Sequence, residues 1–130
     1  MKTLLIVKSA VEVLAGLMFA LLPSFVISVL FAVPLDAPAA ISATRMLGAA
    51  ILAMGLTCWL ARNDSESLAA RGIIAALLFY DAAAVIVLLL ARFDMGLSGI
   101  GLSPAVVLHS GLGIASVICL RKSLSVSRIQ

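Results

Sequence analysis

Charged residues are scarce in this chain of 130 residues, because Asp, Glu, Lys and Arg together make up only 12% of it. Apolar residues make up 64%, and the mean hydropathy is +1.27. A soluble globule of this size needs more polar surface to cover its core. The scarcity of charge therefore excludes a water-soluble domain and favours a protein embedded in a lipid bilayer.

Aromatic residues, cysteines and histidines are also few, and their placement excludes several classes of function. The nine Lys and Arg residues are scattered and not interleaved with aromatic residues, so we expect no nucleic-acid partner. Cys58 and Cys119 form no CxxC or metal-type spacing, so packed thiols are preferred over a redox pair. Glycine-rich phosphate loops, HExxH, a nucleophile elbow and a histidine pair for haem are all missing. No metal site or cofactor is evident, and an enzyme is the less favoured class.

Short segments of alternating polarity, which are typical of a transmembrane β-barrel, are absent as well. The chain instead has apolar segments of about 20 residues, the length that an α-helix needs to cross a hydrocarbon core of roughly 30 Å. The sequence therefore predicts an all-α, polytopic membrane protein that folds as a single domain, a bundle of four transmembrane helices. The expected spans are residues 4–22, 40–61, 68–91 and 104–120.

Prolines mark the expected ends of the first span. Pro23 removes a backbone donor and should end or kink that helix. Residues 24–33 lie between Pro23 and Pro34 and are too short to cross, so we expect an interfacial or re-entrant segment. The alternative is one kinked helix over residues 4–32. The basic, serine-rich residues 121–130 are expected to form a mobile tail.

The first residues resemble the start of a signal peptide, but charged residues interrupt the apolar run, so we expect a membrane helix of the mature protein. Basic residues then indicate the orientation of the bundle. Two of them, Arg45 and Arg92, fall on the side that faces away from the termini. Seven fall on the other side: Lys2, Lys8, Arg62, Arg71, Arg121, Lys122 and Arg128. By the positive-inside rule, both termini are expected in the cytoplasm.

One ionisable residue lies well inside each long apolar run, and these four residues are Glu12, Arg45, Asp81 and His109. A charge at the centre of a membrane helix costs roughly 2.5–3.5 kcal/mol on insertion scales. Such residues should therefore face the bundle interior and find partners there. We predict that they form a ligand or proton site, to which Tyr80 adds a hydroxyl group nearby.

Simpler interpretations exist for three of these residues. Glu12 follows Lys8 by four positions, so the two could form a salt bridge near the inner interface, with Lys8 reaching the headgroups. Arg45 could extend to the outer headgroups. His109 could be a neutral core residue bonded to a backbone carbonyl. Asp81 has no basic residue within a helical turn, so its partner must come from another helix; His109 is one candidate, and Arg45 is the expected counter-charge.

Small residues indicate which helix faces touch, because close contact drives association in lipid. Glycines serve this purpose on every predicted span, with Gly16, Gly48, Gly55, Gly72 and Gly111 among them. Glu12 shares a face with Gly16, and Arg45 shares one with Gly48. The predicted polar residues thus lie on faces that should point inward.

The chain resembles the DoxX-like group of small four-helix bacterial membrane proteins. The resemblance is carried by Glu12-x3-Gly16, Pro23, Arg45-x2-Gly48 and a polar residue in each later helix. This resemblance implies a multi-pass protein of the bacterial inner membrane more than it implies an activity. Members of the group include accessory subunits of quinone-linked oxidoreductases and chaperone-like assembly factors. The chain lacks the cysteine pair of some redox members, which argues against a redox role.

Four functions fit these observations. The favoured one is an accessory or binding protein whose inward polar cluster holds a lipophilic ligand, such as a quinone or a lipid. The alternatives are a proton-linked transporter that acts as an oligomer, a membrane enzyme that uses Asp81 and His109 as acid and base, and an assembly factor without a ligand. The expected partners are the lipid bilayer, a lipophilic small molecule, and a homo-oligomer or larger membrane complex.

Overall fold

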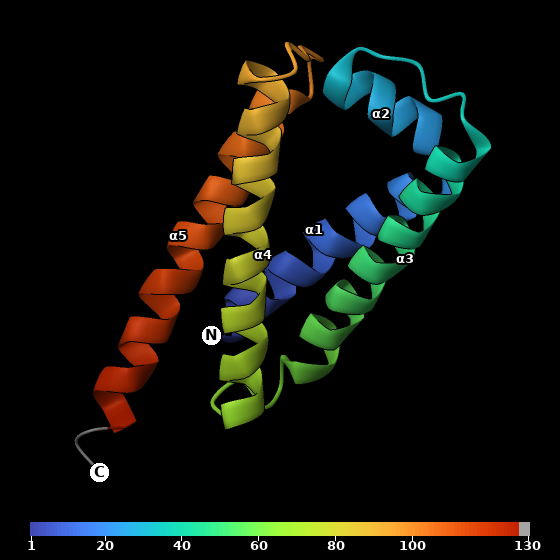
Figure 1. Cartoon of the computed structure of the whole chain (residues 1–130). Coiled ribbons are helices and arrows are strands. Elements are labelled where there is room, and N and C mark those ends of the chain that lie inside the picture. The colour runs from blue at the N-terminus through green and yellow to red at the C-terminus, as the bar shows by residue number, and fades with distance from the viewer. Residues whose placement is uncertain (128–130) are drawn as a thin grey trace.

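The computed structural model describes residues 1–127 and is helical, with no strand in that part of the chain. Five helices follow one another: α1 Lys2–Leu21, α2 Pro23–Phe31, α3 Pro38–Ala61, α4 Leu68–Phe93 and α5 Leu102–Ser127 (Figure 1). Four of them are long and apolar enough to cross a membrane, over Lys2–Leu21, Pro38–Ala61, Leu68–Phe93 and Leu102–Ser123. The predicted fold class is confirmed, and the architecture is that expected of a multi-pass membrane protein.

The break between α1 and α2 falls at Leu22, whose backbone leaves the helical region with φ −125° and ψ 51°. Pro23 then opens α2 at a position where its missing N–H costs nothing. Helix α2 ends at Ala32, which adopts the left-handed conformation with φ 57°. Residues 23–31 therefore form a separate short helix, and the alternative of one kinked helix over residues 4–32 is wrong.

Helix α5 begins two residues before the predicted start and continues past the predicted end, through Ser127. Residues 121–127, which were expected to belong to a mobile tail, are therefore the last part of α5, and residues 128–130 lie outside the described part. Residues 121–127 contain no glycine or proline that would stop the helix.

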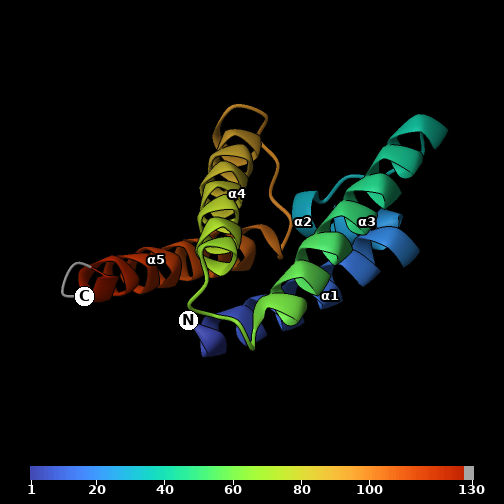
Figure 2. The same cartoon turned by 90° about the horizontal axis from the view of Figure 1, so that it is seen from below.

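The helices associate in two pairs, with α1 lying along α3 and α4 lying beside α5 (Figures 1 and 2). Glycines make the first pair close. A Cβ atom built at Gly48 would lie 2.5 Å from the Ala20 backbone nitrogen, and one built at Gly16 would lie 2.7 Å from the Leu52 nitrogen. Only hydrogen fits at these positions, so the sequence prediction that Gly16 and Gly48 mark a contact face is confirmed.

Two other glycines that were expected to mark packing faces do not do so. A Cβ atom built at Gly72 of α4 or at Gly111 of α5 would meet nothing within 4 Å, and both residues are exposed. Gly113 is the glycine of α5 that faces α4, since its built Cβ would lie 3.7 Å from the Asp81 Cβ. A shift of two positions on α5 thus changes the face by about 200°.

The two helix pairs contact each other over far fewer residues than the helices within each pair. Near the start of α1 and α4 they share an apolar cluster formed by Leu5, Cys58, Ala70, Ile74 and Leu77, against which Cys119 packs. Both cysteines are free thiols, as the packed-thiol interpretation expected. At the other end the Gly101 N–H donates to the Val29 carbonyl at 2.9 Å, which joins α2 to the start of α5. Between these two links lies a group of polar side chains.

Candidate functional site

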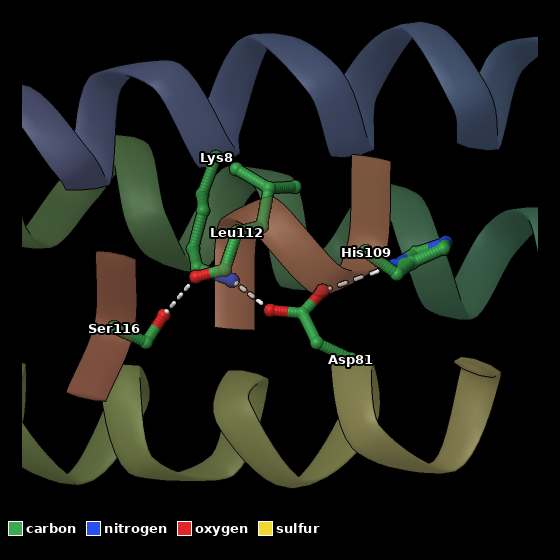
Figure 3. A network of polar contacts seen from close by, with 5 residues as sticks. All are labelled: Lys8, Asp81, His109, Leu112 and Ser116. Atoms are coloured by element: carbon green, nitrogen blue, oxygen red, sulfur yellow. Dashed lines mark hydrogen bonds and ion pairs between the residues drawn. The ribbon is translucent and has the colours of Figure 1, made fainter. Parts of the chain in front are cut away.

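Asp81, in the middle of α4, is the centre of this polar group. Its Oδ2 atom accepts a hydrogen bond from the Lys8 ammonium of α1 at 2.5 Å, and its Oδ1 atom lies 3.0 Å from the His109 Nδ1 atom of α5. Figure 3 shows the carboxylate between these two partners, which reach it from different helices. Three helices therefore meet at one carboxylate that is only 1% exposed. The prediction that Asp81 finds a partner on another helix is confirmed.

Lys8 is the partner that the sequence interpretation placed elsewhere. It was expected near the inner interface, either bound to Glu12 or extended to the headgroups, but it is fully buried at 0% exposure and its ammonium crosses to α4. The reason is its position on α1. Lys8 shares the inward face of α1 with Leu5 and Glu12 at helical spacing, so its side chain points into the bundle and not toward water. That shared buried face was the signal available in the sequence.

His109 is oriented by two contacts. Asp81 engages its Nδ1 atom, and the Tyr80 ring meets the imidazole edge-to-face, with ring centroids 5.5 Å apart and an interplanar angle of 81°. The side chain of His109 is 16% exposed, in contrast to the sealed carboxylate behind it. With Nδ1 occupied, Nε2 is the nitrogen that remains for an external group. Predicted site residues Tyr80, Asp81 and His109 are therefore brought together.

Glu12 lies on the same buried face as Lys8 but has no matching partner. It is 1% exposed, and its Oε1 atom is buried without a hydrogen bond to any residue of the described chain. Close approach of α3 at Gly55 encloses it, since a Cβ atom built at Gly55 would lie 3.2 Å from the Glu12 Cβ. The alternative of a Glu12–Lys8 salt bridge is not found among residues 1–127, because the Lys8 ammonium binds Asp81. An unpartnered buried carboxyl oxygen is costly, so this atom needs a proton or an external partner.

Arg45 stands apart from the site. It was expected as the counter-charge of Asp81, but its side chain is exposed and forms no ion pair within the part of the chain that the structure describes. Lys8 fills that role. Arg45 lies two turns into α3, and although Gly48 on the same helix faces α1, Ala49 is exposed. Arg45 therefore belongs to the edge of the contact face and not to its centre.

Ser116 is a second buried polar residue that the sequence interpretation left out. It is 0% exposed, and its hydroxyl group donates to the Leu112 carbonyl of the same helix at 2.8 Å (Figure 3). This back-bond satisfies the hydroxyl within α5, so Ser116 adds no contact to Asp81. It is therefore a structural neighbour of the site.

The Lys8 ammonium, the Asp81 carboxylate and the His109 imidazole form one hydrogen-bonded network, and the carboxyl group of Glu12 lies on the same buried face as Lys8. Such a network can exchange protons, and it can offer a hydrogen-bonding nitrogen at His109. Among residues 1–127, no group of three or more His, Cys, Asp and Glu side chains is placed to hold a metal ion. No family model, curated protein or solved structure matches the chain. The functional argument therefore depends on the geometry of this site.

Proposed function

We propose that the protein binds a lipophilic ligand with a hydrogen-bonding polar head, such as a quinone or a lipid-like molecule, and that His109 contacts this head. The observation that supports the proposal is the Asp81–His109 hydrogen bond behind a partly exposed imidazole ring. Asp81 fixes the ring and its tautomer, so Nε2 is presented as a prepared partner for a carbonyl or hydroxyl group. Lys8 balances the charge of Asp81 and so offsets part of the desolvation cost of burying that carboxylate.

The test is equilibrium binding of decylubiquinone to the purified full chain in mild detergent. We expect His109→Ala to weaken binding roughly tenfold or more, because a polar head would then face an unpaired site. Tyr80→Phe keeps the ring that packs on His109 and removes only the hydroxyl, so it serves as the matched control and should bind within about twofold. Equal affinity of the native chain and His109→Ala for decylubiquinone, together with no lipophile co-purifying with the native chain, would contradict the proposal.

The location that we propose is a bacterial inner membrane with both termini in the cytoplasm, as in the DoxX-like group that the sequence resembles. The excess of basic residues at the start of α1, around the turn between α3 and α4, and near the end of α5 supports this orientation. An accessory or assembly role within a homo-oligomer or a larger membrane complex fits the small size of the bundle. Purification in mild detergent tests this role, since a lone chain of monomeric mass would count against it.

Proton-linked transport by an oligomer is the second candidate, and the unpartnered Oε1 atom of Glu12 favours it. A carboxyl group enclosed beside the Lys8–Asp81 pair can alternate between its acid and anion forms, and each change would alter the balance of charge around Lys8. Reconstituted proteoliposomes distinguish this candidate from simple binding. Transport requires proton flux in the native chain that Glu12→Gln abolishes, whereas a binding protein shows no flux with either chain.

A further inference from the structure

A polar cavity lies at the end of the molecule opposite α2, well away from Asp81. Its volume is about 190 Å³, and it is lined by Met1, Glu66, Arg71, Cys119, Lys122 and Ser123. These residues come from the start of α1, the turn before α4, the first turn of α4 and the last turns of α5. Arg71 precedes Asp81 by ten positions on α4, which places the two about 15 Å apart along the helix axis. The cavity is therefore distinct from the His109 site.

Arg71 is the residue that marks this cavity as a binding site. Its Nε atom is buried and has no hydrogen-bond partner, and the guanidinium forms no ion pair with any residue of the described chain. A buried donor on a cation that lacks an acceptor is costly, and native structures normally satisfy such atoms. The Arg71 side chain lines the cavity, so an acceptor oxygen bound there can reach its guanidinium group.

The charges around the cavity favour an anion. Arg71 of α4 and Lys122 of α5 bring two positive charges to it from different helices, whereas Glu66 brings one negative charge. Arg71 also lies in the first turn of α4, where the helix dipole adds to the positive potential. The guanidinium group can donate to two oxygens of a phosphate or a carboxylate at once, whereas a halide offers no such pair of acceptors.

The level of the cavity in the bundle points to the source of that phosphate. Arg71 lies in the first turn of the candidate membrane span Leu68–Phe93. Lys122 lies one residue before the end of the candidate span Leu102–Ser123. Side chains at the ends of spans meet the headgroup layer, where basic pockets between helices hold anionic lipid headgroups. We propose that this cavity binds the phosphodiester of an anionic phospholipid, with the Arg71 guanidinium group donating to a non-bridging oxygen.

The test uses native mass spectrometry of the full chain in mild detergent, titrated with phosphatidylglycerol and, separately, with phosphatidylcholine. We expect the native chain to prefer phosphatidylglycerol and Arg71→Gln to bind it roughly tenfold more weakly, as expected for the loss of one charged hydrogen bond. Arg121→Gln is the matched control. It removes the same charge at the same end of the molecule, but Arg121 is exposed and does not line the cavity, so its binding should stay within about twofold of the native value.

Three outcomes would overturn the proposal. Equal weakening by Arg71→Gln and Arg121→Gln would mean that bulk surface charge attracts the lipid. Unchanged binding by Arg71→Gln would remove the cavity from the interaction. Displacement of phosphatidylglycerol by inorganic phosphate or glycerol phosphate at low millimolar concentration would assign the site to a soluble phosphate. If Arg71→Gln unfolds, Arg71→Lys replaces it, because lysine keeps the charge without the paired N–H donors of the guanidinium group. The proposal then requires that Arg71→Lys bind phosphatidylglycerol more weakly than the native chain does, but above background.

Discussion

Lys8 and Asp81 form a buried ion pair that is costly to desolvate and that is attached to His109. Both side chains are almost completely removed from solvent, and neither could stay charged there without the other. Replacing a buried pair by apolar residues is often neutral for stability, whereas removing one member leaves the other charge uncompensated. The pair is therefore better explained by its attachment to His109 than by any gain in stability.

Asp81→Asn is expected to lower the free energy of unfolding by roughly 3–5 kcal/mol, because the fully buried Lys8 ammonium would lose the carboxylate with which it pairs. The measurement is unfolding in mixed detergent followed by circular dichroism. Asp94→Asn makes the same change at an exposed residue just beyond the same helix and should have an effect below about 0.5 kcal/mol.

The double variant Lys8→Met, Asp81→Asn sharpens this prediction. Because it removes both charges, it should be more stable than Asp81→Asn alone by about 1 kcal/mol or more. If the double variant loses, relative to the native chain, as much stability as the two single variants lose together, the two residues do not interact.

Sequence reasoning at this scale identified Asp81 and His109 but assigned the cations wrongly. Asp81 was recognisable because no basic residue lies within a turn of it, so an interhelical partner was required. The identity of that partner was not predictable, since Lys8 lies 73 positions away and its spacing to Glu12 fits a local salt bridge equally well. Arg45 was misplaced because the two residues that follow it by three and four positions differ in burial: Gly48 is buried, whereas Ala49 is exposed like Arg45.

At the scale of the helices, composition and prolines predicted most of the elements. Apolar length located the four spans, and Pro23 located the break before α2. The end of α5 was missed because a basic, serine-rich composition resembles a loop while containing no residue that breaks a helix. Packing between helices was harder still, since Gly48 is enclosed and Gly72 is open although both are glycines of an apolar helix.

The contact of α1 with α3 gives a direct test of that difference. Gly48→Ala would bring a methyl group to 2.5 Å from the Ala20 nitrogen, so one helix must move, and we expect a loss of roughly 1–3 kcal/mol in unfolding free energy. Gly72→Ala and Gly111→Ala are matched controls in open positions, where the higher helix propensity of alanine should leave stability unchanged or raised by up to about 1 kcal/mol. Equal destabilisation by all three changes would contradict the packing described for Gly48.

The whole molecule consists of two tightly packed helix pairs that three small links hold together. An apolar cluster around Leu5 and Ile74 joins them at one end, the Val29–Gly101 hydrogen bond joins them at the other, and Asp81 joins them between. Most contact within the described part of the molecule is internal to each pair, and Asp81 joins the pairs across the less extensive contact between them. A ligand or proton that changes the charge of this site would therefore act directly on the contact between the two halves.

The orientation proposed for the molecule in the membrane can be tested on the whole protein. The turn between α3 and α4 and the loop before α5 lie at opposite ends of the bundle (Figure 1), and each contains exposed residues, Asn63 in the first and Ser98 in the second. In a chain with Cys58→Ala and Cys119→Ala, we expect Ser98→Cys to react with a membrane-impermeant maleimide on intact cells with a permeabilised outer membrane. Asn63→Cys should react only in inverted vesicles, because the basic residues beside it favour the cytoplasmic side. The reverse pattern would place the termini outside the cytoplasm, and labelling of both positions from one side would mean that α4 does not cross the membrane.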